Sequence, residues 1–181
     1  MNDPIYDGFL RRQHAEGLEL AANSDLLELT PDDATPPSRY LARFLCKGLV
    51  RTPAGAIETA RSFLLGIWFP SDYLRRVDPF QVLTLLGPPG VFHPNIGARA
   101  PLICLGHIVP GTPLVDLLDQ AYEVLTYNKV TMCEDDALNR DACVWARENQ
   151  HRFPVDRRPL RRRVLRFDLP VVDIAPEREV R

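Results

Sequence analysis

The stretch that decides the fold is residues 87–111, GPPGVFHPNIGARAPLICLGHIVPG. Proline and glycine recur throughout it, so the segment can form neither a long helix nor a central strand. Irregular connections longer than about 15 residues are uncommon in compact domains and usually have a function. Near its end Cys104 lies between Leu102-Ile103 and Leu105, apolar residues that we expect to be anchored in a core. The sequence therefore predicts a thiol displayed on a rigid, irregular platform.

The composition indicates one soluble, globular protein. The chain has 181 residues, of which 45% are hydrophobic and 25% are charged, as in an ordinary single-core domain. Its formal net charge of -2 argues against a nucleic-acid-binding protein. No apolar run approaches the ~20 residues that span a bilayer, and the N-terminus lacks a secretion signal. We therefore expect a cytoplasmic protein that has no membrane partner.

The cysteines form neither a CxxC pair nor a Cys/His metal spacing, so we expect reduced thiols and no metal or organic cofactor. They are Cys46, Cys104, Cys133 and Cys143.

The chain before the long loop predicts one helix followed by an antiparallel meander. Residues 4–22 have an amphipathic pattern typical of a helix. Short apolar and aromatic-rich runs, separated by turn residues, are typical of strands. We predict these strands at residues 26–30, 40–46, 62–69 and 81–86, with a turn at residues 52–55.

The chain after the loop predicts two helices. Thr112 is a candidate N-cap with Pro113 at the first helical position, and apolar residues then repeat at helical spacing over 114–127. Asn139 is the candidate cap of a second helix at 140–150. The pattern indicates an α+β domain over residues 1–154 and a basic C-terminal tail over residues 155–181.

Four motifs resemble those of the ubiquitin-conjugating enzyme family: FPSDY at 69–73, HPNI at 93–96, ICL at 103–105 and DDALN at 135–139. The resemblance spans roughly residues 4–153. It implies that family's fold: an N-terminal helix, a four-stranded antiparallel meander, a long active-site loop, and then helices.

The chain also departs from the family pattern. Gly106 stands where the family has an acidic or polar residue, Ala137 replaces a proline, and no tryptophan follows the cysteine in its loop. A basic tail replaces the family's last helix. The resemblance is therefore to a divergent member, such as those of bacterial ubiquitin-like conjugation systems, with antiviral defence as the implied setting.

By this resemblance, Cys104 is the nucleophile that carries a modifier as a thioester. A thioester is already activated, so the protein need not supply a strong acid or base. Asn95 either donates to the oxyanion or orders its own loop, and the two roles are compatible. His93 is implied to fix the loop through a backbone hydrogen bond, with a catalytic-base role as the alternative.

Asp136 is implied to lie at the mouth of the site and to orient the incoming lysine. Its alternative role is that of an acid near a helix N-terminus, and the adjacent Asp135 competes for the site role. Tyr127 and Asn128 are further candidates for the mouth. His107 either tunes Cys104 or is a solvent-exposed loop residue.

The implied partners are a ubiquitin-like modifier, an activating enzyme, an acceptor lysine and, where needed, a ligase. Arg11 and Arg12 match the basic face with which the family meets its activating enzyme, although a solvated helix face explains them too. The tail arginines either engage an acidic partner or are simply solvated.

Two other functions stay open at this point. The first is a non-catalytic binding module on the same fold. The second is a thiol hydrolase or redox sensor, which needs a histidine paired with the thiol, and only His93 or His107 could serve.

Overall fold

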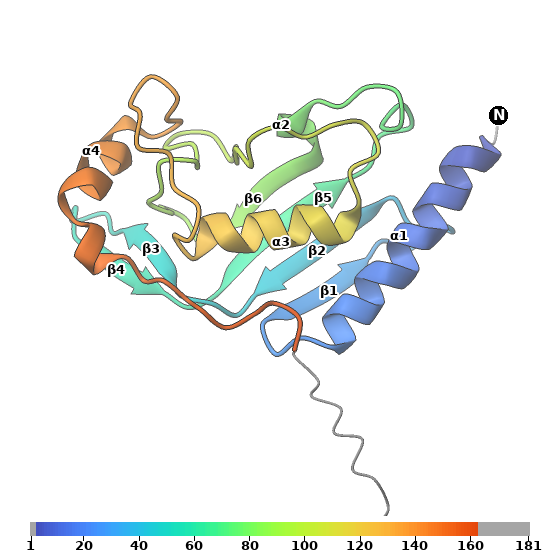
Figure 1. Ribbon diagram of the computed structural model, residues 1–181, viewed down its shortest axis with the longest axis horizontal. Coiled ribbons are helices and arrows are strands. Elements are labelled where there is room, and N and C mark those ends of the chain that lie inside the picture. Colours follow the sequence, from blue (N-terminus) through green and yellow to red (C-terminus); the bar gives the residue numbers. More distant parts are fainter. Residues whose placement is uncertain (1–2, 163–181) are drawn as a thin grey trace, which may run out of the picture.

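The computed structural model describes residues 3–162 and has an α+β architecture (Figure 1). Its elements are, in chain order, α1 (Pro4–Ala22), β1 (Leu27–Pro31), β2 (Arg39–Phe44), β3 (Gly48–Arg51), β4 (Ile57–Ala60), β5 (Phe63–Trp68), α2 (Pro79–Val82), β6 (Leu83–Gly87), α3 (Leu114–Leu125), α4 (Arg140–Glu148) and the short 3-10 helix η1 (Gln150–Arg152). None of the helices within residues 3–162 is long and apolar enough to cross a membrane.

The main sheet has four antiparallel strands in the order β1-β2-β5-β6, as the predicted meander requires. Helices α1 and α3 pack against one of its faces, and α3 runs across the strands (Figure 1). Alternate residues of β2 point to this face, so Tyr40, Ala42 and Phe44 are buried because side chains alternate along a strand. The core lies between the sheet and these helices.

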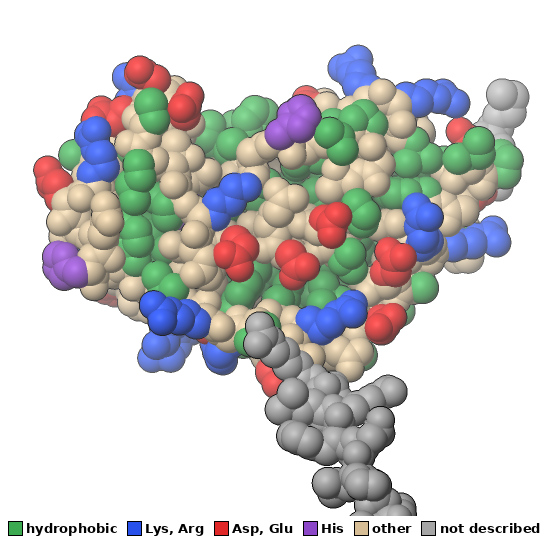
Figure 2. Space-filling model, in the orientation of Figure 1, with side chains coloured by type: hydrophobic (Ala, Val, Ile, Leu, Met, Phe, Trp, Pro, Cys, Tyr) green, Lys and Arg blue, Asp and Glu red, His purple; other side chains and the backbone are tan. Residues whose placement is uncertain are grey.

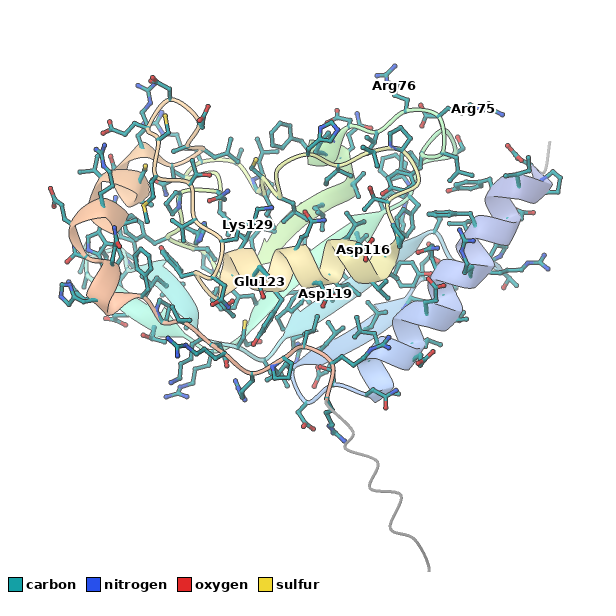
Figure 3. The ribbon with its side chains drawn as sticks, viewed as in Figure 1. Arg75, Arg76, Asp116, Asp119, Glu123 and Lys129 are labelled. Atoms are coloured by element: carbon teal, nitrogen blue, oxygen red, sulfur yellow. The ribbon has the colours of Figure 1, made fainter. Side chains whose placement is uncertain are left out.

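Helix α3 has the two-sided character that its sequence predicts. Leu114, Leu117, Leu118, Ala121 and Leu125 are buried against the sheet. The acidic residues of α3 lie on the opposite side and form a row on the surface (Figures 2 and 3). They are Asp116, Asp119 and Glu123.

The N-terminus of α3 is capped differently from the prediction. Thr112 does not cap the helix, because its hydroxyl donates to the carbonyl of Val109 at 2.7 Å and Pro113 occupies the cap position. The cap instead comes from α1. The Gln13 side-chain oxygen accepts a hydrogen bond from the backbone N–H of Leu114 at 2.7 Å, deep in the core. One orphan N–H of the helix end is thus satisfied from a distant element.

Two further corrections concern the strands. The turn at residues 52–55 is confirmed, but it joins a short two-stranded hairpin, β3–β4, that the sequence prediction lacks. The predicted last strand starts at Leu83 rather than at residue 81. Asp78 accepts from the N–H of Phe80 at 3.0 Å and Pro79 follows it, so the chain first makes the helical turn α2.

The chain beyond η1 continues as an extended strap, residues 153–162, across α3 and α1. Leu160 is buried in the main core, and the Tyr122 hydroxyl donates to the carbonyl of Arg158 at 2.8 Å. Arg162 forms an ion pair with Asp25. The packed chain therefore extends past residue 154, and the remainder of the predicted tail, residues 163–181, lies outside the described residues.

Candidate active site

Cys104 is held on a short ladder that extends the main sheet. The edge of β6 binds the returning chain, because the N–H of Leu85 donates to the carbonyl of Pro101 at 2.9 Å. The same returning chain pairs with residues 95–97: the N–H of Cys104 donates to the carbonyl of Asn95 at 2.8 Å, and Ile96 and Ile103 form an antiparallel bridge. Backbone hydrogen bonds on both sides therefore fix the cysteine's position.

The alternation of an extended chain directs the Cys104 side chain outward. Its neighbours Ile103 and Leu105 are 1% and 0% exposed, whereas Cys104 itself is partly exposed. Cys46 and Cys143 are buried, and burial raises the pKa of Cys46 to about 12. Cys104 and the exposed Cys133 are thus the two accessible thiols among the described residues.

The side chain of Asn95 joins the cysteine segment to a second loop. Asn95 is 4% exposed, and its amide nitrogen donates to the carbonyl of Cys104 at 3.3 Å. Its amide oxygen accepts from the backbone N–H of Thr131 at 2.9 Å. An amide NH₂ has two hydrogens, so one donor of Asn95 stays available after the bond to Cys104. The geometry supports the loop-ordering role and is compatible with an oxyanion role.

His93 is a buried part of the platform. Its Nδ1 accepts from the backbone N–H of Asn95 at 3.0 Å, and its ring packs edge-on against Tyr127 with 4.3 Å between the ring centroids. Burial lowers the pKa of His93 to about 3, so the ring is neutral at physiological pH. A buried, neutral imidazole whose Nδ1 already accepts a bond cannot reach an incoming amine, which favours the loop-fixing role over the catalytic-base role.

The acid loop, residues 131–139, is tied at both ends to the His-Pro-Asn triplet. At its start, the N–H of Thr131 binds Asn95, and at its end the N–H of Asn139 donates to the carbonyl of Pro94 at 3.1 Å. Asn139 then caps α4 as predicted, by accepting from the N–H of Ala142 at 3.1 Å. The triplet, the cysteine segment and the acid loop therefore form one connected unit.

The acid loop carries three acids in different settings. Glu134 forms an ion pair with Arg147, and Asp135 lies 4.0 Å from Arg140. Asp136 is exposed and makes no ion pair within residues 3–162. Of the two adjacent aspartates, Asp136 is therefore the one whose carboxylate is not engaged by a neighbouring arginine.

The two candidates for the mouth of the site, Tyr127 and Asn128, have other contacts, whereas His107 matches one of its two expected alternatives. Tyr127 does not line the mouth; it is 3% exposed, and its hydroxyl donates to the buried carbonyl of Phe92. The Asn128 side chain binds the strap through the carbonyl of Asp156 at 3.0 Å. His107 is exposed, three residues after Cys104.

Sequence reasoning missed Lys129, whose ammonium donates a hydrogen bond to the carbonyl of Leu105. It also missed Thr131, whose contribution is a backbone N–H. A lysine in a polar connector gives no local signal, and a backbone donor gives none at all.

The proposed partner-binding residues lie away from this unit. Arg11 and Arg12 are exposed on α1. Three arginines of the strap are engaged within the chain: Arg158 binds Asp156, Arg161 lies 4.0 Å from Glu19, and Arg162 binds Asp25. The fourth, Arg157, is exposed and makes no ion pair within residues 3–162. Arg163 and Arg166 of the predicted basic tail lie outside the described residues.

The described residues contain no group of three or more His, Cys, Asp or Glu side chains that could hold a metal ion. No family model matches the chain, and the search of curated proteins gave no match.

Proposed function

We propose that this protein is a divergent ubiquitin-conjugating enzyme. Cys104 receives a ubiquitin-like modifier from an activating enzyme and holds it as a thioester. It then passes the modifier to an acceptor amine, for which a lysine side chain is the first candidate. The observation that carries the proposal is that the Asn95 side chain makes two hydrogen bonds, one to the Cys104 carbonyl and one from the acid loop, and so links the two segments. Three of the four motifs that resemble the family, HPNI, ICL and DDALN, are therefore neighbours in space as well as in the right order.

The residues around Cys104 suit acyl transfer between an activated thioester and an amine. The accessible thiol accepts the acyl group by exchange, which needs no strong acid or base. The second N–H of the Asn95 amide can donate to the oxyanion of the tetrahedral intermediate. Such a donor is typically worth about 3–4 kcal/mol at the transition state.

The acceptor lysine must lose its proton before it attacks. Its solution pKa is about 10.4, so it arrives protonated. The exposed carboxylate of Asp136 attracts and orients that ammonium at the acid loop. This is the role we assign to Asp136.

Two alternative functions fit the geometry less well. A thiol hydrolase needs a histidine beside the thiol, but His93 is buried on Asn95 and His107 makes no side-chain hydrogen bond within residues 3–162. A non-catalytic binding module would not need an accessible thiol on a segment that backbone hydrogen bonds hold in place.

The test uses ATP together with candidate activating enzymes and modifiers encoded in neighbouring genes. On a non-reducing gel, the proposal predicts an adduct of this chain that a thiol reductant removes. Cys104→Ser should give a reductant-resistant ester or no adduct. Cys133→Ser is the matched control, because Cys133 is the other accessible thiol, and it should load normally.

The opposite pattern would refute the proposal. Loading that persists unchanged as a thioester in Cys104→Ser, or that disappears only in Cys133→Ser, means that Cys104 is not the carrier. Turnover of an acyl substrate without ATP and an activating enzyme would indicate a hydrolase instead.

A further inference from the structure

Lys129 brings an amine to the segment that carries Cys104. The chain leaves α3 through a left-handed turn at Tyr127, where φ is 61°. The backbone N–H groups of Asn128 and Lys129 both donate to the carbonyl of Glu123 at 2.9 Å, so the chain folds back after the helix. The Lys129 ammonium then binds the carbonyl of Leu105, the residue next to Cys104. Figure 3 shows Lys129 past Glu123, at this end of α3.

This amine is unusual in the chain. The sequence has 22 lysines and arginines, and only Lys47 and Lys129 are lysines. A guanidinium stays protonated and is a poor acyl acceptor, whereas an amine can be acylated. Lys47 is exposed between β2 and β3. Lys129 is therefore the side-chain amine that the described structure holds against the Cys104 segment.

Gly106 leaves room for this amine. It follows Leu105 with a φ of 93°, and a Cβ at this position would lie 3.3 Å from the Lys129 Nζ. An acidic side chain at position 106 would pair with the ammonium and hold it. With glycine there, the Lys129 amine is bound to a neutral carbonyl, a weaker partner than a carboxylate.

We propose that Lys129 is an internal acyl acceptor. When no external amine takes the modifier, the deprotonated Nζ attacks the carbonyl carbon of the Cys104 thioester. A C–N bond forms, the C–S bond breaks, the sulfur leaves as a thiolate and takes up a proton, and the nitrogen gives its proton to solvent. The product is an amide on Lys129 that thiols cannot remove, so the protein carries a permanent modifier beside its own thiol.

This inference rests on the proposed function, because the acyl group comes from the Cys104 thioester. It can nevertheless be tested with a chemical probe in place of the modifier. The probe is a short peptide with a C-terminal 2-mercaptoethanesulfonate thioester, which acylates accessible thiols by exchange. The full chain with Cys133→Ser leaves Cys104 as the accessible thiol among the described residues.

After incubation with the probe, dithiothreitol removes thioesters and tandem mass spectrometry locates the acyl groups that remain. We expect the stable adduct at Lys129, with Lys47 as the internal reference amine. Short tethers give effective concentrations in the millimolar range. At a probe concentration of about 0.1 mM, Cys104→Ala should therefore lower Lys129 acylation roughly tenfold or more.

Three outcomes would overturn the inference: no stable adduct, a stable adduct confined to Lys47 or the N-terminal amine, or equal labelling of Lys129 in Cys104→Ala. The last would mean direct acylation by the probe. Lys129→Arg keeps a donor for the Leu105 carbonyl and removes the acceptor amine. In Lys129→Arg, the ratio of stable adduct to Cys104 thioester should fall to background. An unchanged ratio would also count against the inference.

The failure of this inference is distinguishable from that of the proposed function. A reductant-sensitive adduct with modifier and activating enzyme, without any amide on Lys129, refutes only the internal acceptor. A probe-derived amide on Lys129, without any modifier thioester on Cys104, refutes only the conjugating function.

Discussion

Replacing Asn95 by alanine should loosen the connection between Cys104 and the acid loop. The substitution removes two hydrogen bonds, one of 3.3 Å to the Cys104 carbonyl and one of 2.9 Å from the Thr131 N–H. Each such bond contributes about 1 kcal/mol, and the unpaired Thr131 N–H adds a desolvation cost. Because Asn95 is 4% exposed, water cannot easily replace these bonds. We expect the free energy of unfolding to fall by about 2–3 kcal/mol.

Urea unfolding followed by circular dichroism measures this loss. With a slope of about 2 kcal/mol per molar urea, the midpoint should fall by about 1–1.5 M. Hydrogen exchange adds a local readout, since the Thr131 amide should lose its protection. In the conjugation assay, Asn95→Ala should slow discharge to lysine more than loading of Cys104.

Asn128→Ala is the matched control for this prediction. Asn128 also makes two side-chain hydrogen bonds, to Thr126 at 2.9 Å and to the strap at 3.0 Å, but it is exposed. Its loss should cost less than about 1 kcal/mol and leave the Thr131 amide protected. A loss of less than about 0.5 kcal/mol for Asn95→Ala, or a Thr131 amide that keeps its protection, would contradict this role of Asn95. Equal slowing of loading and discharge would leave Asn95 with a purely structural role.

Three further predictions concern the rest of the framework. Burial lowers the pKa of His93 to about 3. As the pH falls, the unfolded chain therefore takes up a proton at His93 before the folded chain does. The free energy of unfolding should be intact above about pH 6.5 and should fall below it by up to about 1.4 kcal/mol per pH unit. Urea unfolding at pH 7, 6 and 5 checks this, and His93→Gln should remove that slope; an equal slope in both proteins would contradict it. Gln13→Ala should cost about 1–2 kcal/mol by removing the cap of α3. The same change at the partly exposed Gln120 of α3 should be nearly neutral. Gly48→Ala should cost about 1–3 kcal/mol in thermal or urea unfolding, because its Cβ would lie 2.7 Å from the backbone oxygen of Leu125; Gly8→Ala, where nothing lies within 4 Å, is the comparison that should not destabilise.

Local patterns predicted the elements whose cause is local. The helix over residues 4–22 is observed as α1 with the same limits, because its apolar spacing lies within the segment and its capping residue, Asp3, directly precedes it. Asn139 caps α4 for the same reason. The short strands β3 and β4 lacked a signal, since four residues each are too few to establish a period. The cap predicted at Thr112 is wrong, because the Thr112 hydroxyl donates to the carbonyl of Val109 instead of bonding to the helix.

The sequence by itself determined the class of the fold, the order of the motifs and the outward direction of Cys104. The last follows from alternation in an extended chain, where Ile103 and Leu105 have to face the core. Only the tertiary structure decided which groups meet at the site. Asn95 binds Thr131 across 36 positions of sequence, and Gln13 caps α3 across 101. Such pairings depend on how the packed sheet and helices bring distant backbone groups together, and no periodicity within one segment encodes them.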